Sequence, residues 1–415
     1  MVAAFLLVAA VGTTLLILPV TDGGERPLTL LEASFTAISA LCVTGLTVVD
    51  TGTAWNGLGQ VTILALIQLG GLGVMLVASF IGVTIGRRLS LRGQNLAGAE
   101  NRTLSTADVR RISRGIIATS LIIEAVVALV LTMRFMWGYA LQPGDALWHG
   151  VFHAVSSFNN AGFSLFRDNM VGFATDPWIN FPLCAAIVLG GLGYPVLFQL
   201  RREFRQPKHW SMNTRIVLFM TVLLLVVGFL AFLAFEWSNA RTLGSYSVWD
   251  RLQVAMFQAV QARTAGVNGV DFGAVNPETL LTFDILMFIG GGPAGTAGGI
   301  KVTTFAVLLF ILVAEFRGEG AVNIFGKRLS RSVHREAITI ALVASAAVVA
   351  GTLVLLVTSH LDLDVLLFEA VSAFGTVGLS TGITASLPPV AQIMLMILMF
   401  LGRLGPLTLG TALVL

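Results

Sequence analysis

One pattern recurs four times along this chain and limits what the chain can fold into. A phenylalanine within an apolar run is followed nine or ten residues later by a glycine: Phe35 and Gly45, Phe152 and Gly162, Phe257 and Gly266, Phe368 and Gly378. Successive glycines of this set lie between 104 and 117 residues apart. That period is too long for a solenoid repeat and long enough for a small membrane unit. The chain is therefore predicted to be four copies of one unit.

Each copy predicts a short helix that runs directly into a turn, as in FEAVSAFGTVGLSTG at residues 368–382. The negative C-terminal end of such a helix stabilises a cation. Glycine has no side chain to block an axis, so backbone carbonyls can face an ion there. The pattern predicts four pore helices that feed one filter. The predicted filter residues are Val43, Thr44, Gly45, Asn160, Ala161, Gly162, Thr264, Ala265, Gly266, Thr376, Val377 and Gly378.

Composition places the four units in a membrane. Hydrophobic residues make up 56% of the chain and charged residues 11%, against about 25% charged residues in soluble domains. The two cysteines, Cys42 and Cys184, lie in apolar stretches and provide no disulfide framework. Of the 25 Lys and Arg residues, 17 fall in segments 87–114, 201–215 and 317–335. The positive-inside rule makes these segments cytoplasmic and predicts a multi-pass protein with both termini in the cytoplasm.

The apolar runs between the basic segments predict the fold class, an all-α membrane protein of four tandem M1-P-M2 units. Each unit has an outer helix, a re-entrant pore loop and an inner helix. Eight transmembrane helices and four pore loops then surround one central pore with pseudo-fourfold symmetry. Inner helices are expected as continuous spans at 58–86, 178–200 and 389–415, and in two pieces in the third unit. The predicted units are 1–86, 87–205, 206–320 and 321–415.

The third inner helix contains IGGGPAGTAGGIK at residues 289–301, where seven of thirteen residues are glycine or proline. Such a run interrupts a helix. An interruption at membrane depth is tolerated only where the backbone is buried in protein or lines a water-filled cavity. A gate is therefore predicted next to the filter. Its residues are Gly290, Gly291, Gly292, Pro293, Ala294, Gly295, Thr296, Ala297, Gly298, Gly299, Lys301 and, from the last span, Arg403.

Several ionisable residues fall inside apolar segments. Arg403 stands where other inner helices have glycine, and it is predicted to face the pore as an electrostatic barrier or, alternatively, to bond a loop carbonyl. Lys301 lies at the end of the glycine-rich run. It is equally expected to take part in gating or to extend its ammonium group to the inner membrane interface. Arg263 is expected to brace the pore loop, because a fixed positive charge beside a cation site would repel the ion. Glu124 and Glu369 are expected to make hydrogen bonds at helix ends rather than to transfer protons.

Polar residues of the second pore loop allow further expectations. Asn159 and Asn160 either brace the filter or face the outer vestibule. His149 and His153 lie four apart on a predicted pore helix, a spacing that can bind a metal, but no third ligand is near in the sequence. The expected metal is therefore the ion at the filter alone.

These motifs resemble the Trk/Ktr/HKT superfamily of cation channels and transporters, most closely the KtrB membrane subunits of bacterial Ktr potassium uptake systems. The stretches that carry the resemblance are VTGLTVVDTGT at 43–53, FNNAGFSL at 158–165, ARTAGVN at 262–268 and FGTVGL at 374–379. The resemblance implies K⁺ transport through one pore in a plasma-membrane protein, with a gate at the third inner helix. A serine in the first filter favours Na⁺ in this superfamily, so Gly45 favours K⁺. Gly45→Ser is predicted to relax that selectivity.

The same resemblance implies partners. KtrB-like subunits form homodimers and are gated by a cytoplasmic ring of RCK-type, KtrA-like nucleotide-binding subunits. The sequence ends at the close of its last span, so we expect no regulatory domain and no nucleotide in this chain. Membrane lipid is expected to surround it, Na⁺ is a possible modulator, and no nucleic acid is expected.

Alternatives remain open at this point. A Na⁺-permeable protein or a cation-coupled secondary transporter would also contain broken helices, although inverted repeats would give its halves opposite topology. A membrane enzyme would need convergent His, Cys, Asp or Glu, and the five histidines are scattered. The glycine-rich run at 289–301 lacks the spacing of a phosphate-binding loop. We therefore expect a transport protein and not an enzyme.

Overall fold

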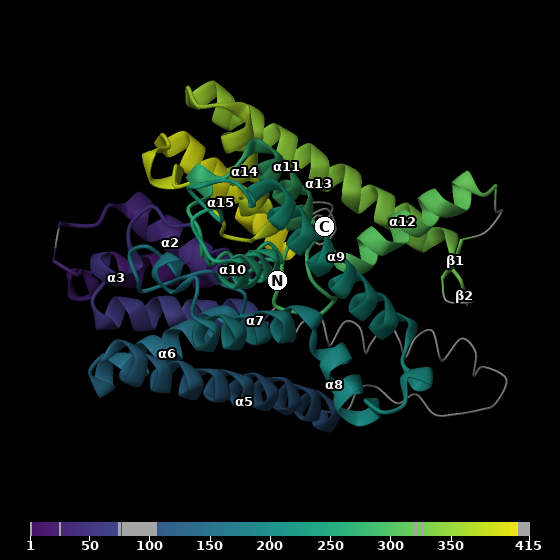
Figure 1. The fold of residues 1–415 in the computed structure, drawn as a ribbon, viewed down its shortest axis with the longest axis horizontal. Helices are drawn as coiled ribbons and strands as arrows, with labels where there is room; N and C mark the ends of the chain where they lie inside the picture. The colour runs from purple at the N-terminus through teal and green to yellow at the C-terminus, as the bar shows by residue number, and fades with distance from the viewer. Residues whose placement is uncertain are drawn as a thin grey trace.

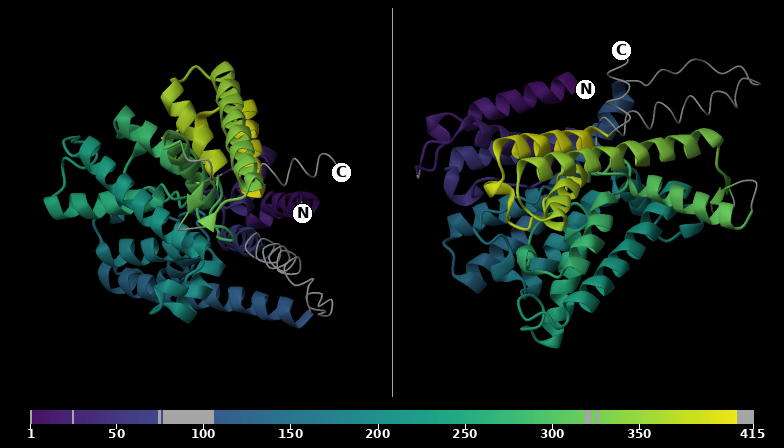
Figure 2. Two further views of the ribbon diagram at one scale, coloured as in Figure 1. Left: turned by 90° about the vertical axis from the view of Figure 1, so that its right-hand side faces the viewer. Right: turned by 90° about the horizontal axis from the view of Figure 1, so that it is seen from above.

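The computed structural model describes residues 2–24, 26–73, 76, 106–318, 322–324 and 327–405, and these are almost entirely helical. The helices at the four predicted outer positions are α1 (Val2–Leu16), α5 (Thr106–Tyr139), α9 (Met212–Glu236) and α13 (Arg331–Thr358). They all run from right to left in Figure 1, α9 and α13 obliquely to the long axis of the molecule, and Figure 2 shows them from two further sides. This common direction is expected for tandem repeats and differs from inverted repeats.

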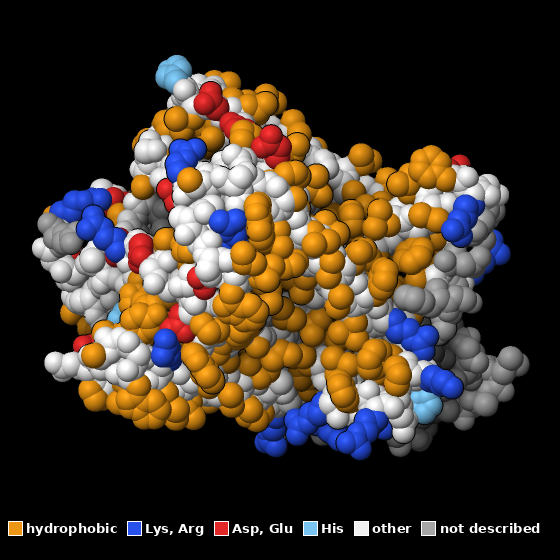
Figure 3. Space-filling model, viewed as in Figure 1, with side chains coloured by type: hydrophobic (Ala, Val, Ile, Leu, Met, Phe, Trp, Pro, Cys, Tyr) orange, Lys and Arg blue, Asp and Glu red, His pale blue; other side chains and the backbone are white. Residues whose placement is uncertain are grey.

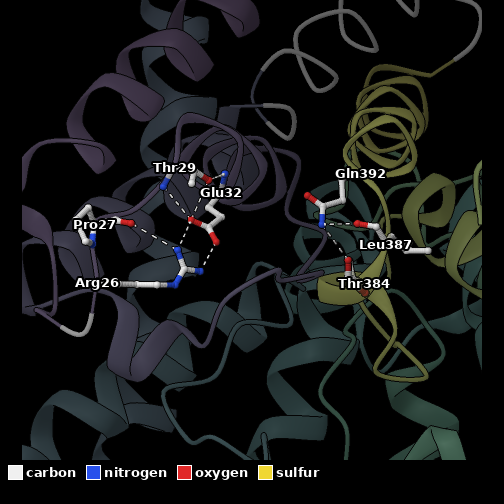
Figure 4. A network of polar contacts seen from close by, with 7 residues as sticks. All are labelled: Arg26, Pro27, Thr29, Glu32, Thr384, Leu387 and Gln392. Carbon is white, nitrogen blue, oxygen red and sulfur yellow. Dashed lines mark hydrogen bonds and ion pairs between the residues drawn. The ribbon is translucent and has the colours of Figure 1, made fainter.

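A pore helix follows each outer helix, and its motif phenylalanine is fully buried. Phe35, Phe152, Phe257 and Phe368 are each 0% exposed and belong to the hydrophobic core. Side-chain caps begin two of these helices: Thr29 with Glu32 in a capping box (Figure 4), and Ser247. A third begins with Pro143 in its first turn. The pore helices are α2 (Leu30–Cys42), α6 (Pro143–Phe158), α10 (Val248–Gln261) and α14 (Leu363–Gly375).

The inner helices differ from one another. The first is a helix at Gly57–Gly73, and the fourth is α15 (Pro389–Leu404). The third has two pieces, α11 (Pro277–Phe288) and α12 (Val302–Phe316), which confirms the interruption expected at 289–301.

The second inner helix corrects a prediction. The continuous span expected at 178–200 is instead α7 (Pro177–Leu192) and α8 (Tyr194–Glu203), bent by 102°. Gly193 makes the bend with φ of 88°, a left-handed value that glycine adopts without steric cost.

Short elements connect these helices. They are α3 (Thr51–Ala54), a hairpin of β1 (Asn323–Ile324) and β2 (Lys327–Arg328), and the 3₁₀ turns Pro19–Thr21, Val171–Phe173, Pro207–His209, Phe272–Ala274 and Thr384–Ser386.

The distribution of apolar and basic side chains on the surface is that expected of a membrane protein. Apolar side chains cover much of the face in Figure 3, whereas Lys and Arg gather at the end of the molecule where α8 and the start of α9 lie. Within the described residues, α5, α9 and α13 are long and apolar enough to cross a bilayer, and the bent pair α7–α8 is a fourth candidate. The predicted inner spans at 58–86 and 389–415 lie partly outside the described residues, so the count of eight spans stays a prediction.

Candidate functional site

The four predicted filter stretches have the same backbone conformation. Two residues before each glycine, a residue other than glycine has a left-handed φ between 48° and 69°. Each glycine itself has a positive φ, between 62° and 95°. A left-handed φ is uncommon outside glycine, so its repetition at one position in four copies marks an imposed local structure. The pairs are Val43 and Gly45, Asn160 and Gly162, Thr264 and Gly266, and Thr376 and Gly378.

The four glycines meet in a closed ring. A Cβ placed on Gly45 would lie 2.5 Å from the carbonyl oxygen of Ala161, and one on Gly162 would lie 3.0 Å from that of Ala265. A Cβ on Gly266 would lie 2.0 Å from the Val377 oxygen, and one on Gly378 would lie 2.1 Å from the Thr44 oxygen. The stretches therefore contact one another in chain order, and the fourth contacts the first. The glycines are required because the neighbouring backbone leaves no room for a side chain.

Each pore helix is tied to its filter stretch by the residue four positions after the motif phenylalanine. The backbone oxygens of Ser39, Ser156, Gln261 and Ser372 accept from the N–H of the residue before each glycine, at 2.7–3.1 Å. Their side chains add a second bond. Ser39 and Ser372 accept from the glycine N–H, each at 3.1 Å, and Gln261 accepts from Val267 N–H at 3.0 Å. In the third copy the filter glycine comes one residue earlier than in the others. The side chain of Gln261 is longer than that of serine and reaches the N–H of Val267 beyond this shorter turn.

The loop between α11 and α12 packs against this ring. Gly292 N–H donates to Gly191 O at 2.8 Å and Thr296 N–H donates to Gly190 O at 3.2 Å, so the second inner helix holds the loop. The Thr296 hydroxyl donates to the Asn160 side chain in the second filter stretch at 3.1 Å. A Cβ on Gly298 would lie 2.1 Å from the hydroxyl oxygen of Thr376, so the loop also reaches the fourth stretch.

Three basic residues contact the loop. Arg403 is 5% exposed and donates to Thr296 O in the loop and, at 2.7 Å, to Gly70 O in the first inner helix. Arg263 donates to Ile289 O at 3.3 Å and Gly290 O at 3.0 Å, where α11 ends. Lys301 turns back to donate to Ala297 O at 2.7 Å. Buried cations here are therefore compensated by backbone carbonyls of one loop.

The asparagines of the second stretch brace their surroundings. Asn160 donates to the Thr264 hydroxyl at 3.2 Å, which joins the second stretch to the third. Asn159 donates to Gln68 at 2.6 Å and to the Glu124 carboxylate at 3.3 Å, and Gln68 also donates to Glu124 at 3.0 Å.

The two glutamates lie in the middle of their own helices, Glu124 in α5 and Glu369 in α14, and bond the ends of other elements. Glu124 accepts from Asn159, which caps the C-terminal end of α6, and Glu369 accepts from Thr384, which begins a 3₁₀ turn. The hydrogen bonds expected at helix ends are therefore present. His149 and His153 stack with Phe166, and among the described residues no group of three or more His, Cys, Asp or Glu is placed to hold a metal.

The structure thus brings together every residue predicted for the filter and places the predicted gate loop, with Lys301 and Arg403, directly beside it. Sequence reasoning missed the tie residues Ser39, Ser156, Gln261 and Ser372. Their signal was present as a polar residue at one fixed offset in four apolar helices. It also missed Gly190 and Gly191 as acceptors for the loop, which no local pattern indicates.

Comparison with known proteins agrees with this geometry. The family model described as "TrkH: Cation transport protein" matches residues 1–414. The chain belongs to the TrkH family. Its fold is also that of a TrkH potassium transporter from Vibrio parahaemolyticus, with a TM-score of 0.75 at 21% identity over 100% of this chain and 85% of that one.

The chain is similar in sequence to several potassium uptake proteins. The chain is 38% identical to the Ktr system potassium uptake protein B of Bacillus subtilis, over 97% of this chain and 90% of the relative. It is 37% identical to the protein of the same name from Vibrio alginolyticus, over 98% and 89%. It is 32% identical to the potassium/sodium uptake protein NtpJ of Enterococcus hirae, over 98% and 90%. Family and fold together make this a helical membrane protein of cation transport.

Proposed function

We propose that the chain is the ion-translocating subunit of a potassium uptake system. K⁺ passes along the axis of the glycine ring, where backbone carbonyls of the four filter stretches replace its water. The single observation that carries the proposal is the closed contact of the four glycines in chain order. Such a ring presents backbone oxygens from four sides, the arrangement that a dehydrated monovalent cation requires.

The filter has structural support in its repeated conformation. Paired left-handed residues, such as Val43 with Gly45 and Thr376 with Gly378, turn successive peptide units in the same way in each copy. The pore helices end at the ring, so the negative ends of four helix dipoles converge on it. The four copies differ in side chain beside the glycine, and we propose one strong site rather than a long row of sites.

We propose the α11–α12 loop as the gate. It packs against the second and fourth filter stretches, and Arg403 ties it to the first inner helix through Thr296 O and Gly70 O. Opening requires these bonds to break, and Arg403 acts as the latch. Charge repulsion of the ion by the same guanidinium adds to the barrier.

We propose four units at 1–86, 87–205, 206–320 and 321–415, eight spans, both termini in the cytoplasm and a place in the plasma membrane. We also propose a homodimer that works with a separate RCK-type regulatory ring. Two relatives are named as proteins of a Ktr system, which supports a partner of this kind. The basic stretch over α8 and the start of α9 is the proposed docking side for that ring. Binding of nucleotide belongs to the ring and not to this chain.

Na⁺ is the second candidate ion. One relative at 32% identity is named a potassium/sodium uptake protein, which favours testing Na⁺ both as a transported ion and as a modulator.

The test is K⁺ uptake by cells that lack their own K⁺ uptake systems and express this chain with and without a KtrA-like ring subunit, each at two Na⁺ concentrations. We expect uptake that saturates with K⁺ and is abolished by Gly266→Ser. Gly57→Ser is the matched control, because a Cβ on Gly57 has nothing within 4 Å. Equal uptake by cells with and without the membrane-inserted chain, in the presence of the ring, would refute the proposal.

A further inference from the structure

The residue directly after each motif phenylalanine is polar in all four copies, although the residues on either side of it, phenylalanine and alanine, are apolar. These residues, which we call the anchor residues, are Thr36, His153, Gln258 and Glu369. None is more than 1% exposed. Three of them, His153, Gln258 and Glu369, make hydrogen bonds to the chain that follows the filter glycine of their own unit. We call the residues that follow each filter glycine the exit segment of that unit. The exit segments of the second, third and fourth units extend as far as Met170, Val270 and Thr384.

Glu369 holds the exit segment of the fourth unit. Its carboxylate accepts from the Ser380 hydroxyl at 2.5 Å, from Thr381 N–H at 3.0 Å and from the Thr384 hydroxyl at 2.9 Å. The Thr384 carbonyl in turn accepts from Gln392 in α15 at 3.4 Å, as Figure 4 shows. The exit segment is therefore joined to both the pore helix and the inner helix of its unit.

His153 makes the same pair of contacts in the second unit. Its Nε2 lies 3.1 Å from the Ser164 hydroxyl and accepts from Leu165 N–H at 3.3 Å. Ser164 and Leu165 stand two and three residues after Gly162, as Ser380 and Thr381 do after Gly378. The His149 carbonyl accepts from His153 Nδ1 at 2.7 Å, which leaves Nε2 free of a proton and able to accept.

Gln258 provides the third contact, and Thr36 does not provide a fourth. With its side-chain oxygen toward the exit segment, Gln258 accepts from Gly269 N–H at 2.8 Å and Val270 N–H at 3.1 Å. The Thr36 hydroxyl is buried and has no hydrogen-bond partner within the part of the chain that the structure describes.

Further bonds join the three anchored exit segments to one another. Met170 N–H donates to Asn268 O at 3.0 Å, and the Asn268 side chain donates to Ser380 O at 3.4 Å. Within the described residues, the exit segment of the first unit makes no such hydrogen bond to another exit segment.

We infer that His153, Gln258 and Glu369 are positioning residues for ion discrimination, and that the first quarter of the filter is the least constrained. The inference rests on the proposed function. Discrimination between K⁺ and Na⁺ needs carbonyls held at a set spacing, because Na⁺ is smaller and gains when the ring contracts. The anchors hold the exit segments of three filter stretches outward against that contraction. Replacing Glu369 by leucine leaves a buried N–H and two hydroxyls without their acceptor.

The test compares apolar and amide replacements by measuring the KM for K⁺ uptake and the inhibition constant of Na⁺. Glu369→Leu and His153→Leu are expected to lower the preference for K⁺ over Na⁺ by about tenfold, the equivalent of one lost buried hydrogen bond. Glu369→Gln and His153→Gln are expected to keep the preference within about twofold, because the third unit already uses glutamine. Thr36→Val is the matched control and is expected to change nothing.

A purely structural role would lower protein yield or maximal rate and leave the ratio of the two constants unchanged. That result in both leucine variants would overturn the inference, and so would an equal loss in Thr36→Val. If Glu369→Leu does not insert in the membrane, His153→Leu and the two glutamine variants decide. Failure of the proposed function is a different result: the wild-type chain would then show no saturable K⁺ uptake at all.

Discussion

The ring of four filter glycines and the α11–α12 loop lie side by side but differ in how far they follow the fourfold repeat. The ring repeats one backbone conformation four times, with a glycine at each contact. The loop layer has no repeat: one inner helix is bent at Gly193, one is interrupted at 289–301, and the fourth places the buried Arg403 against the loop. Under the proposed function, the ion site needs equivalent oxygens on all sides, and the four copies are alike there. The proposed gate needs one movable element and one latch, and the copies differ there.

The same glycine-rich position in four inner helices illustrates the divergence. Gly70 offers its carbonyl to Arg403, and the carbonyls of Gly190 and Gly191 accept from the loop. In the third helix the position opens into the loop itself. Under the proposed function, the four copies of this segment serve as latch, latch acceptor, loop support and loop, whereas the four predicted filter stretches share one backbone conformation.

The largest expected effect tests the ring. Gly266→Ala and Gly378→Ala are expected to reduce K⁺ uptake by about 100-fold or more, because the added Cβ would lie 2.0 Å from the Val377 oxygen and 2.1 Å from the Thr44 oxygen and would displace the neighbouring filter stretch. Gly162→Ala is expected to be mildest, at about tenfold, since its Cβ would lie 3.0 Å from the nearest atom. Initial rates of K⁺ uptake at matched membrane expression measure this order. A larger loss in Gly162→Ala than in Gly266→Ala would show that the ring contacts do not govern transport.

The second effect tests the latch. Arg403→Gln is expected to raise the uptake rate about tenfold, because the loop loses two charge-assisted hydrogen bonds. Arg403→Lys separates two explanations. Lysine keeps the charge but lacks the planar fork that reaches Thr296 O and Gly70 O together. A latch with an added charge barrier predicts that the lysine variant transports faster than wild type and somewhat slower than the glutamine variant. A lysine variant as slow as wild type would support a purely electrostatic barrier.

The third effect tests the bend of the second inner helix. Gly193→Ala places a Cβ 2.3 Å from Pro293 O and forces alanine to a φ of 88°. We expect the free energy of unfolding to fall by about 1–3 kcal/mol. Thermal unfolding in detergent measures the loss, with Gly57→Ala as the control at an open position. An unchanged melting temperature would mean that the loop does not pack on Gly193 as described.

The smallest effect compares the third pore helix with the other three. Gln261→Ser restores the residue type of the other copies but is too short to reach Val267 N–H in the shorter third turn. Loss of that one bond is expected to cost about 1 kcal/mol, or about a fivefold rise in the KM for K⁺. Ser39→Gln is the reciprocal change, expected to disturb the first copy similarly. Wild-type KM values in both variants would show that the shorter spacing of the third copy has no effect on K⁺ uptake.

Much of the ring was predictable because it repeats. The recurrence of phenylalanine and glycine located the four glycines that meet in the ring, and the shorter spacing between Phe257 and Gly266 already indicated that the third copy differs. The interruption at 289–301 was predictable because glycine and proline act on the backbone locally. These features depend on residue type at a fixed position, which a sequence displays directly.

The contacts that join different units were not predictable in the same way. Nothing local indicates that Arg403 meets Thr296, over a hundred residues away, or that Gly191 accepts from Gly292. The bend at Gly193 was missed because glycine within an apolar run is equally common in straight, closely packed membrane helices. The sequence indicated that Glu124 and Glu369 make hydrogen bonds, but it did not identify their partners, Asn159 and Thr384, which approach only in the folded chain.

The most direct test of the central claim is ion competition in vesicles that contain the purified protein. Uptake of K⁺ is measured against increasing Na⁺ for the wild-type chain, Gly45→Ser and Gly57→Ser. The glycine ring predicts that wild type and Gly57→Ser prefer K⁺ equally, and that Gly45→Ser loses most of that preference. A Gly45→Ser protein that discriminates between K⁺ and Na⁺ as well as wild type would contradict the account.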